Sequence, residues 1–472
     1  MRPNILLYCT DQQRFDTIGA LGNPHVRTPT LDRLVESGTA FTHTYCQSPI
    51  CTPSRASLMS GLYPSRVHNT RNGNATFPDE RPLISKLIAD SGYDCGMIGK
   101  FHLQSSGKRT EPRLDDGFRV WQFSHAPRDD WPVGEHDYAD WVRERGGDLN
   151  AMRESPERVP PEFHQTTWAT ERAIEFIDDA GKARDEGQPW FLNLNIYDPH
   201  PPFIPPREYE EKFDPDALPG PHFEPGDLET QAKLKDADFQ DEVRSPAEHD
   251  AFRAQARYYA MISLIDDQLA RLLAHLEASG QAENTIVIFT SDHGETLGDH
   301  GLMYKGCRFY EGLVRIPLLF HAPGRGIRSD FQSDALVEWL DLSATLLDLA
   351  EVPVPDYHQG KSLLPLLTEP ATDSVAHREF VRSEYFDALA PEFTGGHGAF
   401  ATMHRTRTHK LCLYHSLGGV GELYDLETDP WEHKDLWDDP ASREIRDRLI
   451  HESFDAHVML TTDVGSERIA PM

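Results

Sequence analysis

Four short apolar segments of this chain each end in a cluster of polar, chemically active residues. Such segments have the composition of buried β-strands, and side chains that follow a strand gather at one edge of the sheet. The segments and the clusters that follow them are 4–10 with Asp11-Gln12, 93–98 with Gly99-Lys100-Phe101-His102, 190–196 with Tyr197-Asp198-Pro199-His200, and 285–290 with Ser291-Asp292-His293-Gly294.

Segments with helical periodicity alternate with these strands. Residues 252–279 keep an apolar stripe at the spacing of an α-helix, and Gly280 stands where a glycine often ends one. Residues 83–89 are predicted to form a shorter helix that Gly92 ends. Alternating strands and helices indicate an α/β fold with a mostly parallel sheet sandwiched by helices, which binds ligands beyond the carboxyl ends of its strands.

Two polar segments interrupt this alternation and are predicted to be insertions, at about 104–161 and about 201–247. We therefore predict a main α/β domain over residues 1–370 that carries both insertions. A smaller C-terminal α+β domain over 371–472 is predicted from three strand-like pieces and a last helix, at 400–404, 410–415, 422–425 and 441–454.

Charge and cysteine usage restrict the partners and the compartment. The formal net charge is −31, which disfavours nucleic acid and anionic membranes as partners. No run approaches the roughly 18 apolar residues of a membrane-spanning helix, and residues 1–8 are predicted to be a core strand rather than a secretory signal. The 6 cysteines form no C-x-x-C pair, so we expect neither a disulfide framework nor a zinc site. A reducing cytoplasm fits best.

Cys51 begins a denser motif, Cys51-Thr52-Pro53-Ser54-Arg55, which is followed by Ala and Ser and by a glycine at position 61. Pro53 suits the first turn of a helix, so Cys51 is predicted to stand near a helix N-terminus, where N–H groups and the helix dipole favour an anion. Arg55 adds further donors one turn later. Taken alone, a cysteine before a helix is more often a plain thiol than a functional one.

This motif resembles the signature of the sulfatases, whose cysteine is oxidised to formylglycine by a formylglycine-generating enzyme. Residues 92–103 are similar to the second sulfatase signature, and they end in Gly99-Lys100-Phe101-His102-Leu103. Further similarity extends from Pro3-Asn4 to Asp429-Pro430, thus over nearly the whole chain. The resemblance implies the alkaline-phosphatase-like α/β fold, with residues 1–370 as the catalytic domain, and the hydrolysis of a small-molecule sulfate ester.

The resemblance also implies one divalent metal ion, held by Asp11, Gln12, Asp292 and His293 together with the side chain of Cys51. Taken singly, a carboxylate at a strand end is more often a cap of a turn or helix. The commoner sulfatase pattern has Asp in place of Gln12 and Asn in place of His293. The family implies Ca²⁺, while the imidazole nitrogen leaves Mn²⁺ open, and Mg²⁺ as well.

In the mechanism that the resemblance implies, formylglycine made from Cys51 is hydrated, attacks sulfur and forms a covalent sulfo-enzyme. Arg55 and Lys100 match the residues that hold this group. His102 matches the base that then removes a proton, so that sulfate leaves and the aldehyde returns.

His200 and Lys305 resemble the family's His and Lys that serve the bridging oxygen of the departing alcohol. Which of the two is the general acid stays open at this stage. The substrate also stays open among aryl, alkyl, choline and sugar sulfates.

Two other functions are weighed against a sulfatase. A phosphonate monoester or phosphodiester hydrolase of the same superfamily would share the formylglycine, the metal and the Asp-His pair, but Lys100 with His102 favours a sulfatase. A non-catalytic protein that binds sulfated ligands would be expected to lack part of the catalytic set. That set is complete in the sequence, so only an unmodified Cys51 would support this alternative.

Aromatic residues of the first insertion suggest a further hypothesis, because they stand among acidic residues and could cage a quaternary ammonium group through cation–π contacts. Anchoring of the insertion to the main domain is the favoured interpretation. The residues are Trp121, Trp131, Tyr138 and Trp141. The tail at 466–472 could reach a neighbouring subunit, so a homo-oligomer stays open.

Overall fold

The structure is a computed structural model of the chain, and it describes residues 2–184, 187–368, 377–390 and 398–462. The predicted domain boundary at residues 370 and 371 and the tail at 466–472 lie outside these ranges. Within the described residues, no helix combines the length and the apolar character that crossing a membrane requires.

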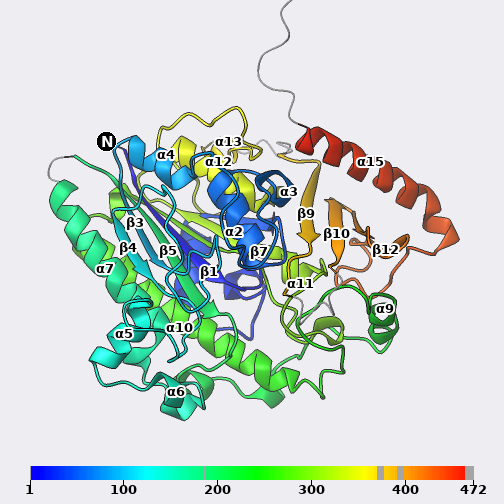
Figure 1. Cartoon of the computed structure of the whole chain (residues 1–472), viewed down its shortest axis with the longest axis horizontal. Helices are drawn as coiled ribbons and strands as arrows, with labels where there is room; N and C mark the ends of the chain where they lie inside the picture. The colour runs from blue at the N-terminus through cyan, green and yellow to red at the C-terminus, as the bar shows by residue number, and fades with distance from the viewer. Residues whose placement is uncertain (1, 185–186, 369–376, 391–397, 463–472) are drawn as a thin grey trace, which may run out of the picture.

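An eight-stranded sheet forms the centre of the molecule, in the spatial order β4-β3-β5-β1-β6-β7-β2-β8 (Figure 1). β7 runs antiparallel to both of its neighbours, and the other pairs are parallel. The strands are β1 (Asn4–Asp11), β2 (Thr39–Tyr45), β3 (Asp94–Gly99), β4 (Val120–Phe123), β5 (Trp190–Pro199), β6 (Thr285–Ser291), β7 (Arg315–His321) and β8 (Phe331–Glu338).

Helices cover both faces of this sheet, because alternate strand residues are apolar on each side. In β1, Leu6 and Tyr8 join the hydrophobic cluster of one face, and Ile5 and Leu7 join that of the other. The first face is covered by α1 (Pro29–Ser37), α7 (Gln165–Arg184) and α10 (Ala251–Ala278), and the second by α2 (Cys51–Ser60), α4 (Ile84–Asp90) and α12 (Trp339–Leu349). The predicted α/β fold is confirmed.

The two predicted insertions contain short elements. In the first, β4 pairs with β3 and extends the main sheet at its edge, which the polar composition of this segment did not indicate. The short helices of the chain are α3 (Pro64–Val67), α5 (Asp137–Glu144), α6 (Leu149–Met152), α8 (Arg207–Glu210), α9 (Asp227–Lys233), α11 (Glu311–Val314) and α13 (Leu364–Thr368).

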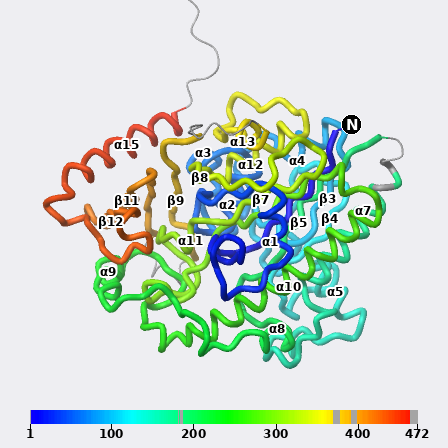
Figure 2. The backbone as a smooth tube through the Cα atoms, turned by 180° about the vertical axis from the view of Figure 1, so that it is seen from behind, coloured from blue at the N-terminus to red at the C-terminus, as the bar shows by residue number. Residues whose placement is uncertain are grey.

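A second sheet, of four antiparallel strands in the order β12-β11-β10-β9, follows in the chain. Its elements are β9 (Phe380–Phe386), β10 (Phe400–Thr406), β11 (His409–Tyr414), β12 (Val420–Asp425) and α15 (Arg443–Thr461). The three predicted strands and the last helix are present, and β9 was not predicted. Tyr385 of β9 belongs to the same hydrophobic cluster as Trp339 of α12, so the small sheet packs against the main one (Figure 2).

Candidate active site

The carboxyl ends of four neighbouring parallel strands bring the predicted polar clusters to one edge of the main sheet. β3, β5, β1 and β6 lie side by side in this order. Because each strand delivers its cluster at the same edge, residues almost 300 positions apart in the chain become neighbours. Lys100 follows β3, His200 follows β5, Asp11 ends β1, and Asp292 follows β6.

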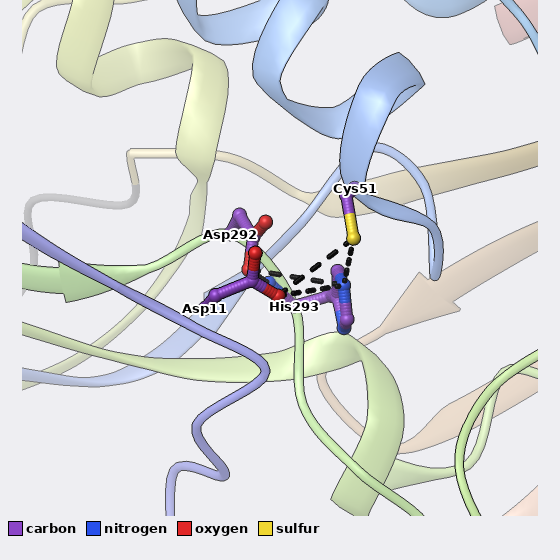
Figure 3. A group of neighbouring side chains, drawn as sticks. All are labelled: Asp11, Cys51, Asp292 and His293. Carbon is purple, nitrogen blue, oxygen red and sulfur yellow. Dashed lines mark hydrogen bonds and ion pairs between the residues drawn. The ribbon is translucent and has the colours of Figure 1, made fainter. Parts of the chain in front are cut away.

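Cys51 is the first residue of α2, and its side chain points at this edge of the sheet (Figure 3). Its Sγ lies 2.9 Å from Lys305 Nζ, 3.5 Å from Lys100 Nζ and 3.1 Å from His293 Nε2. Burial raises the pKa of the Cys51 thiol, but Lys100, Lys305 and two neighbouring histidines together hold it well below its usual range. Position 51 therefore favours negative charge, as the helix N-terminus also does.

Arg55, one turn into α2, connects the two carboxylates of the site. Its Nε donates to Asp292 Oδ2 at 2.7 Å, and its Nη2 lies 3.3 Å from Asp11 Oδ2. Lys100 Nζ donates to the same Asp11 oxygen at 2.5 Å. Burial raises the pKa of Asp11, but Lys100, His200 and Arg55 together hold it below its usual range. With Lys305 nearby, three cations face two carboxylates, so a further negative charge at position 51 is compensated.

Four of the predicted metal-site residues present ligand atoms to one point. The ligand atoms of Asp11, Cys51, Asp292 and His293 lie within 4.8 Å of one another, and all four residues are buried (Figure 3). His293 Nδ1 is 2.8 Å from the carbonyl oxygen of Gly294, which can only accept, so Nδ1 carries a proton and Nε2 is the ring atom that can bind an ion. Two carboxylates and an imidazole nitrogen fit one divalent ion.

Gln12, the fifth predicted metal-site residue, lies beside this group, but its side chain is engaged elsewhere. Lys305 Nζ donates to Gln12 Oε1 at 2.7 Å, and Gln12 Nε2 donates to Glu295. The backbone N–H of Gln12 donates to Asp292 Oδ1 at 3.0 Å. Gln12 thus contacts the group through Lys305 and through its own backbone.

His102 lies in the loop after β3, with a left-handed backbone at φ 58°. The carboxylate of Glu111 accepts hydrogen bonds from the N–H groups of His102 at 2.7 Å, Leu103 at 2.6 Å and Gln104 at 2.8 Å. Burial, followed by the charge of Lys100, lowers the pKa of His102 to about 4, so its ring is neutral near pH 7. Glu111 belongs to no motif, and the sequence analysis missed it.

His200 and Lys305 offer different donors to a leaving group. His200 Nδ1 lies 2.7 Å from the carbonyl oxygen of Pro201, so it carries a proton, and the neutral ring presents the lone pair of Nε2. Burial, and then Lys305, lower the pKa of His200, which favours this neutral form. The Lys305 ammonium can donate directly, whereas His200 Nε2 must first be protonated.

The aromatic residues of the first insertion pack into the protein instead of lining an open cage. The guanidinium of Arg145 covers the Trp141 ring at 4.4 Å, and that of Arg113 covers Trp121 at 4.9 Å. The buried members of the group are Trp131, Tyr138 and Trp141. These contacts agree with the favoured interpretation, in which the rings anchor the insertion.

A protein-family model described as Sulfatase matches residues 3–352. The chain belongs to the sulfatase family. A second model, described as the C-terminal part of N-sulphoglucosamine sulphohydrolase, matches residues 298–457 of this sulfatase. The predicted family and the enzyme class, a sulfuric ester hydrolase, are confirmed.

Curated relatives match this sulfatase along almost its whole length. It is 28% identical to an arylsulfatase of Clostridium perfringens, over 95% of this chain and 92% of that protein. It is 30% identical to the multifunctional alkaline phosphatase superfamily protein PehA of Trinickia caryophylli, over 93% and 92%.

Solved structures show the same fold. The phosphonate monoester hydrolase of Agrobacterium radiobacter superposes with a TM-score of 0.82 and 25% identity, over 97% of this chain and 96% of that one. A protein solved with its substrate D-glucosamine-2-N,6-O-disulfate superposes with a TM-score of 0.77 and 23% identity, over 98% of each chain.

Proposed function

We propose that this sulfatase hydrolyses sulfate monoesters with a formylglycine made from Cys51 as its nucleophile. The observation that carries the proposal is the position of Cys51 Sγ at the N-terminus of α2, 2.9 Å from Lys305 Nζ and 3.5 Å from Lys100 Nζ. A sulfate group at this point would face two ammonium groups and free helix N–H groups. These donors stabilise the negative charge that develops on the sulfate oxygens and the leaving oxygen.

A divalent ion belongs to the same proposal, because the buried ligand set fits one. Asp11, Asp292 and His293 would hold it together with the side chain at position 51, and Gln12 lies next to them. When present, the ion and the formylglycine supply an ionised hydroxyl nucleophile and polarise the sulfate. We propose Ca²⁺, with Mn²⁺ and Mg²⁺ as the alternatives that metal analysis separates.

The other side chains bind, orient and move protons. Arg55 fixes both carboxylates of the ligand set, and Lys100 neutralises Asp11 while it faces position 51. His102 is neutral and beside Cys51, so it can accept a proton from the side chain at position 51. We assign the proton donor for the leaving oxygen to Lys305.

His200 receives a different part in this proposal. Its neutral ring presents Nε2 as an acceptor, so it orients the leaving alcohol and does not protonate it. A bound alcohol would donate a hydrogen bond to Nε2.

A phosphonate monoester or phosphodiester hydrolase is the second candidate, because two solved phosphonate monoester hydrolases share the fold at a TM-score of 0.82. Lys100 and His102, the pair that favours a sulfatase, both lie beside the side chain of Cys51. We therefore rank sulfate esters ahead of phosphonates as substrates. A binding protein without catalysis would require Cys51 to stay a thiol.

The deciding experiment compares p-nitrophenyl sulfate with p-nitrophenyl phenylphosphonate, on protein co-expressed with a formylglycine-generating enzyme. We expect a higher kcat/KM for the sulfate, no turnover by Cys51→Ala, and nearly unchanged turnover by Cys412→Ala, a buried thiol of the small sheet. A higher kcat/KM for the phosphonate would make the second candidate correct. A mass spectrum that shows an unmodified residue 51 in active protein would contradict the formylglycine.

A cytoplasmic location and maturation by a formylglycine-generating enzyme complete the proposal. All six cysteines are free, which suits a reducing compartment. In that compartment the substrate would be a small ester rather than an extracellular polymer.

A further inference from the structure

A second group of metal-ligating side chains lies outside the active site. Asp227, His300 and His433 bring their ligand atoms within 4.8 Å of one another. They come from three distant segments: Asp227 begins α9 of the second insertion, His300 lies in the short helix η6 (Asp299–Gly301), and His433 follows β12. Both views of the backbone place α9 beside β12 (Figures 1 and 2). We call these three residues the second triad.

The distances within the second triad are compatible with three ligands of one ion, although His433 is also within hydrogen-bond distance of Asp227. His300 Nδ1 lies 3.6 Å from Asp227 Oδ1, which is too long for a hydrogen bond. His433 Nδ1 lies 3.1 Å from both oxygens of the same carboxylate. Two ligands at about 2.0–2.1 Å from a tetrahedral zinc ion stand about 3.3 Å apart. The observed separations lie on either side of that value.

Burial and orientation show a built site rather than a chance group on the surface. The side chains of His300 and Asp227 are 4% and 2% exposed, and that of His433 is 17% exposed. The His300 ring stacks on Tyr310 with centroids 3.7 Å apart, which fixes its plane. Asp227 Oδ2 accepts the N–H of Glu224 at 2.8 Å, so the carboxylate is oriented as well. The partly exposed His433 gives an ion a way in.

We propose that the second triad binds a divalent transition-metal ion of the zinc class, with a water molecule completing the coordination. Two imidazoles and one carboxylate are the donors such ions prefer, whereas Ca²⁺ and Mg²⁺ prefer oxygen ligands throughout. The ion joins the insertion, the loop between Asp292 and Lys305, and the segment after β12. The site is separate from the ligand group around Cys51, since the two groups share no residue, and an ion that joins three segments would stabilise the fold.

The test counts metal on full-length, matured protein that has been stripped with a chelator, loaded with Zn²⁺ and dialysed. We expect His433→Gln and Asp227→Asn each to hold one zinc ion fewer per chain than the wild type, and to bind it at least about tenfold more weakly. Added Zn²⁺ is expected to raise the Tm of the wild type and not that of these variants. The control is His222→Gln. The ring of His222 stacks on Trp431 with centroids 3.4 Å apart, and His222 does not belong to the triad.

Equal zinc content and equal affinity in the wild type and both variants would overturn the proposal. Should His433→Gln fail to fold by circular dichroism, the isosteric Asp227→Asn decides. Asp292→Asn is expected to lose a different ion and to keep the zinc of the second triad. This inference therefore stands or fails independently of the proposed sulfatase mechanism.

Discussion

The carboxylate of Glu111 holds His102 in place: Glu111 Oε2 accepts the backbone N–H of His102 at 2.7 Å, where the chain is left-handed at φ 58°. Two further N–H groups, of Leu103 and Gln104, donate to the other carboxylate oxygen. Glu111 is thus a positioning residue for a side chain that we place in the reaction.

Replacement of Glu111 by Ala is expected to lower kcat by about 10- to 100-fold and to leave KM nearly unchanged, because a small displacement of a catalytic group costs rate more than binding. Glu111→Gln keeps one acceptor oxygen, so its kcat should lie between that of the wild type and that of Glu111→Ala. Glu154→Ala is the control, since Glu154 forms an exposed ion pair with Arg158. Steady-state kinetics on the aryl sulfate measure the effect, and a loss seen mainly in KM would contradict the assignment.

Glu111 should also make stability depend on pH. Burial raises its pKa from 4.5 to about 7, although the three backbone N–H groups act in the opposite direction. Between these values the folded chain binds more protons than the unfolded chain, so the free energy of unfolding falls as pH rises. The loss is on the order of 3 kcal/mol. Urea unfolding at about pH 4.5 and about pH 8 should show this loss in the wild type and not in Glu111→Gln. If the difference in the free energy of unfolding between the two proteins were the same at both pH values, the prediction would be wrong.

Arg378 joins the small sheet to α12 by a buried ion-pair network. Its guanidinium donates to Asp341 Oδ2 at 2.8 Å and lies 3.1 Å from Glu338 Oε2. Arg378→Leu leaves two buried carboxylates without their cation and should cost about 3–5 kcal/mol of stability.

The matched control is Arg407→Leu, since Arg407 is 60% exposed and pairs with an exposed Asp334. It should cost about 1 kcal/mol or less. Chemical denaturation compares the two variants, and equal costs would show that the buried network carries no special weight.

Gly99, immediately before Lys100, must be glycine for steric reasons. At φ 101°, a Cβ at this position would lie 1.8 Å from the carbonyl oxygen of Asn195 in the neighbouring strand. We expect Gly99→Ala to separate β3 from β5 and to displace Lys100. The variant should lose activity, and its Tm should fall below that of the wild type. Gly134→Ala tests the backbone cost alone, because Gly134 has φ 85° and no atom within 4 Å of its Cβ position. It should cost about 1–2 kcal/mol.

Local patterns made much of the fold and of the candidate site predictable. The apolar runs at 4–10, 93–98, 190–196 and 285–290 form strands of the main sheet, and the stripe at 252–279 forms α10. These features depend on short-range periodicity, which a chain carries whatever its tertiary contacts. β4 was not predicted because a short edge strand in a polar segment lacks apolar periodicity. β9 was not predicted because its sequence shows no distinctive strand pattern, although the strand packs on the shared hydrophobic core.

The sequence by itself determined the family and the α/β class and named the candidate active-site residues, because motifs and periodicity are properties of neighbouring positions. Only the tertiary structure decided that Gln12 contacts Lys305, that Glu111 holds His102, and that the second triad assembles from three segments. Each of these contacts joins residues through space, and packing of the whole chain selects such partners. No local pattern could therefore have revealed them.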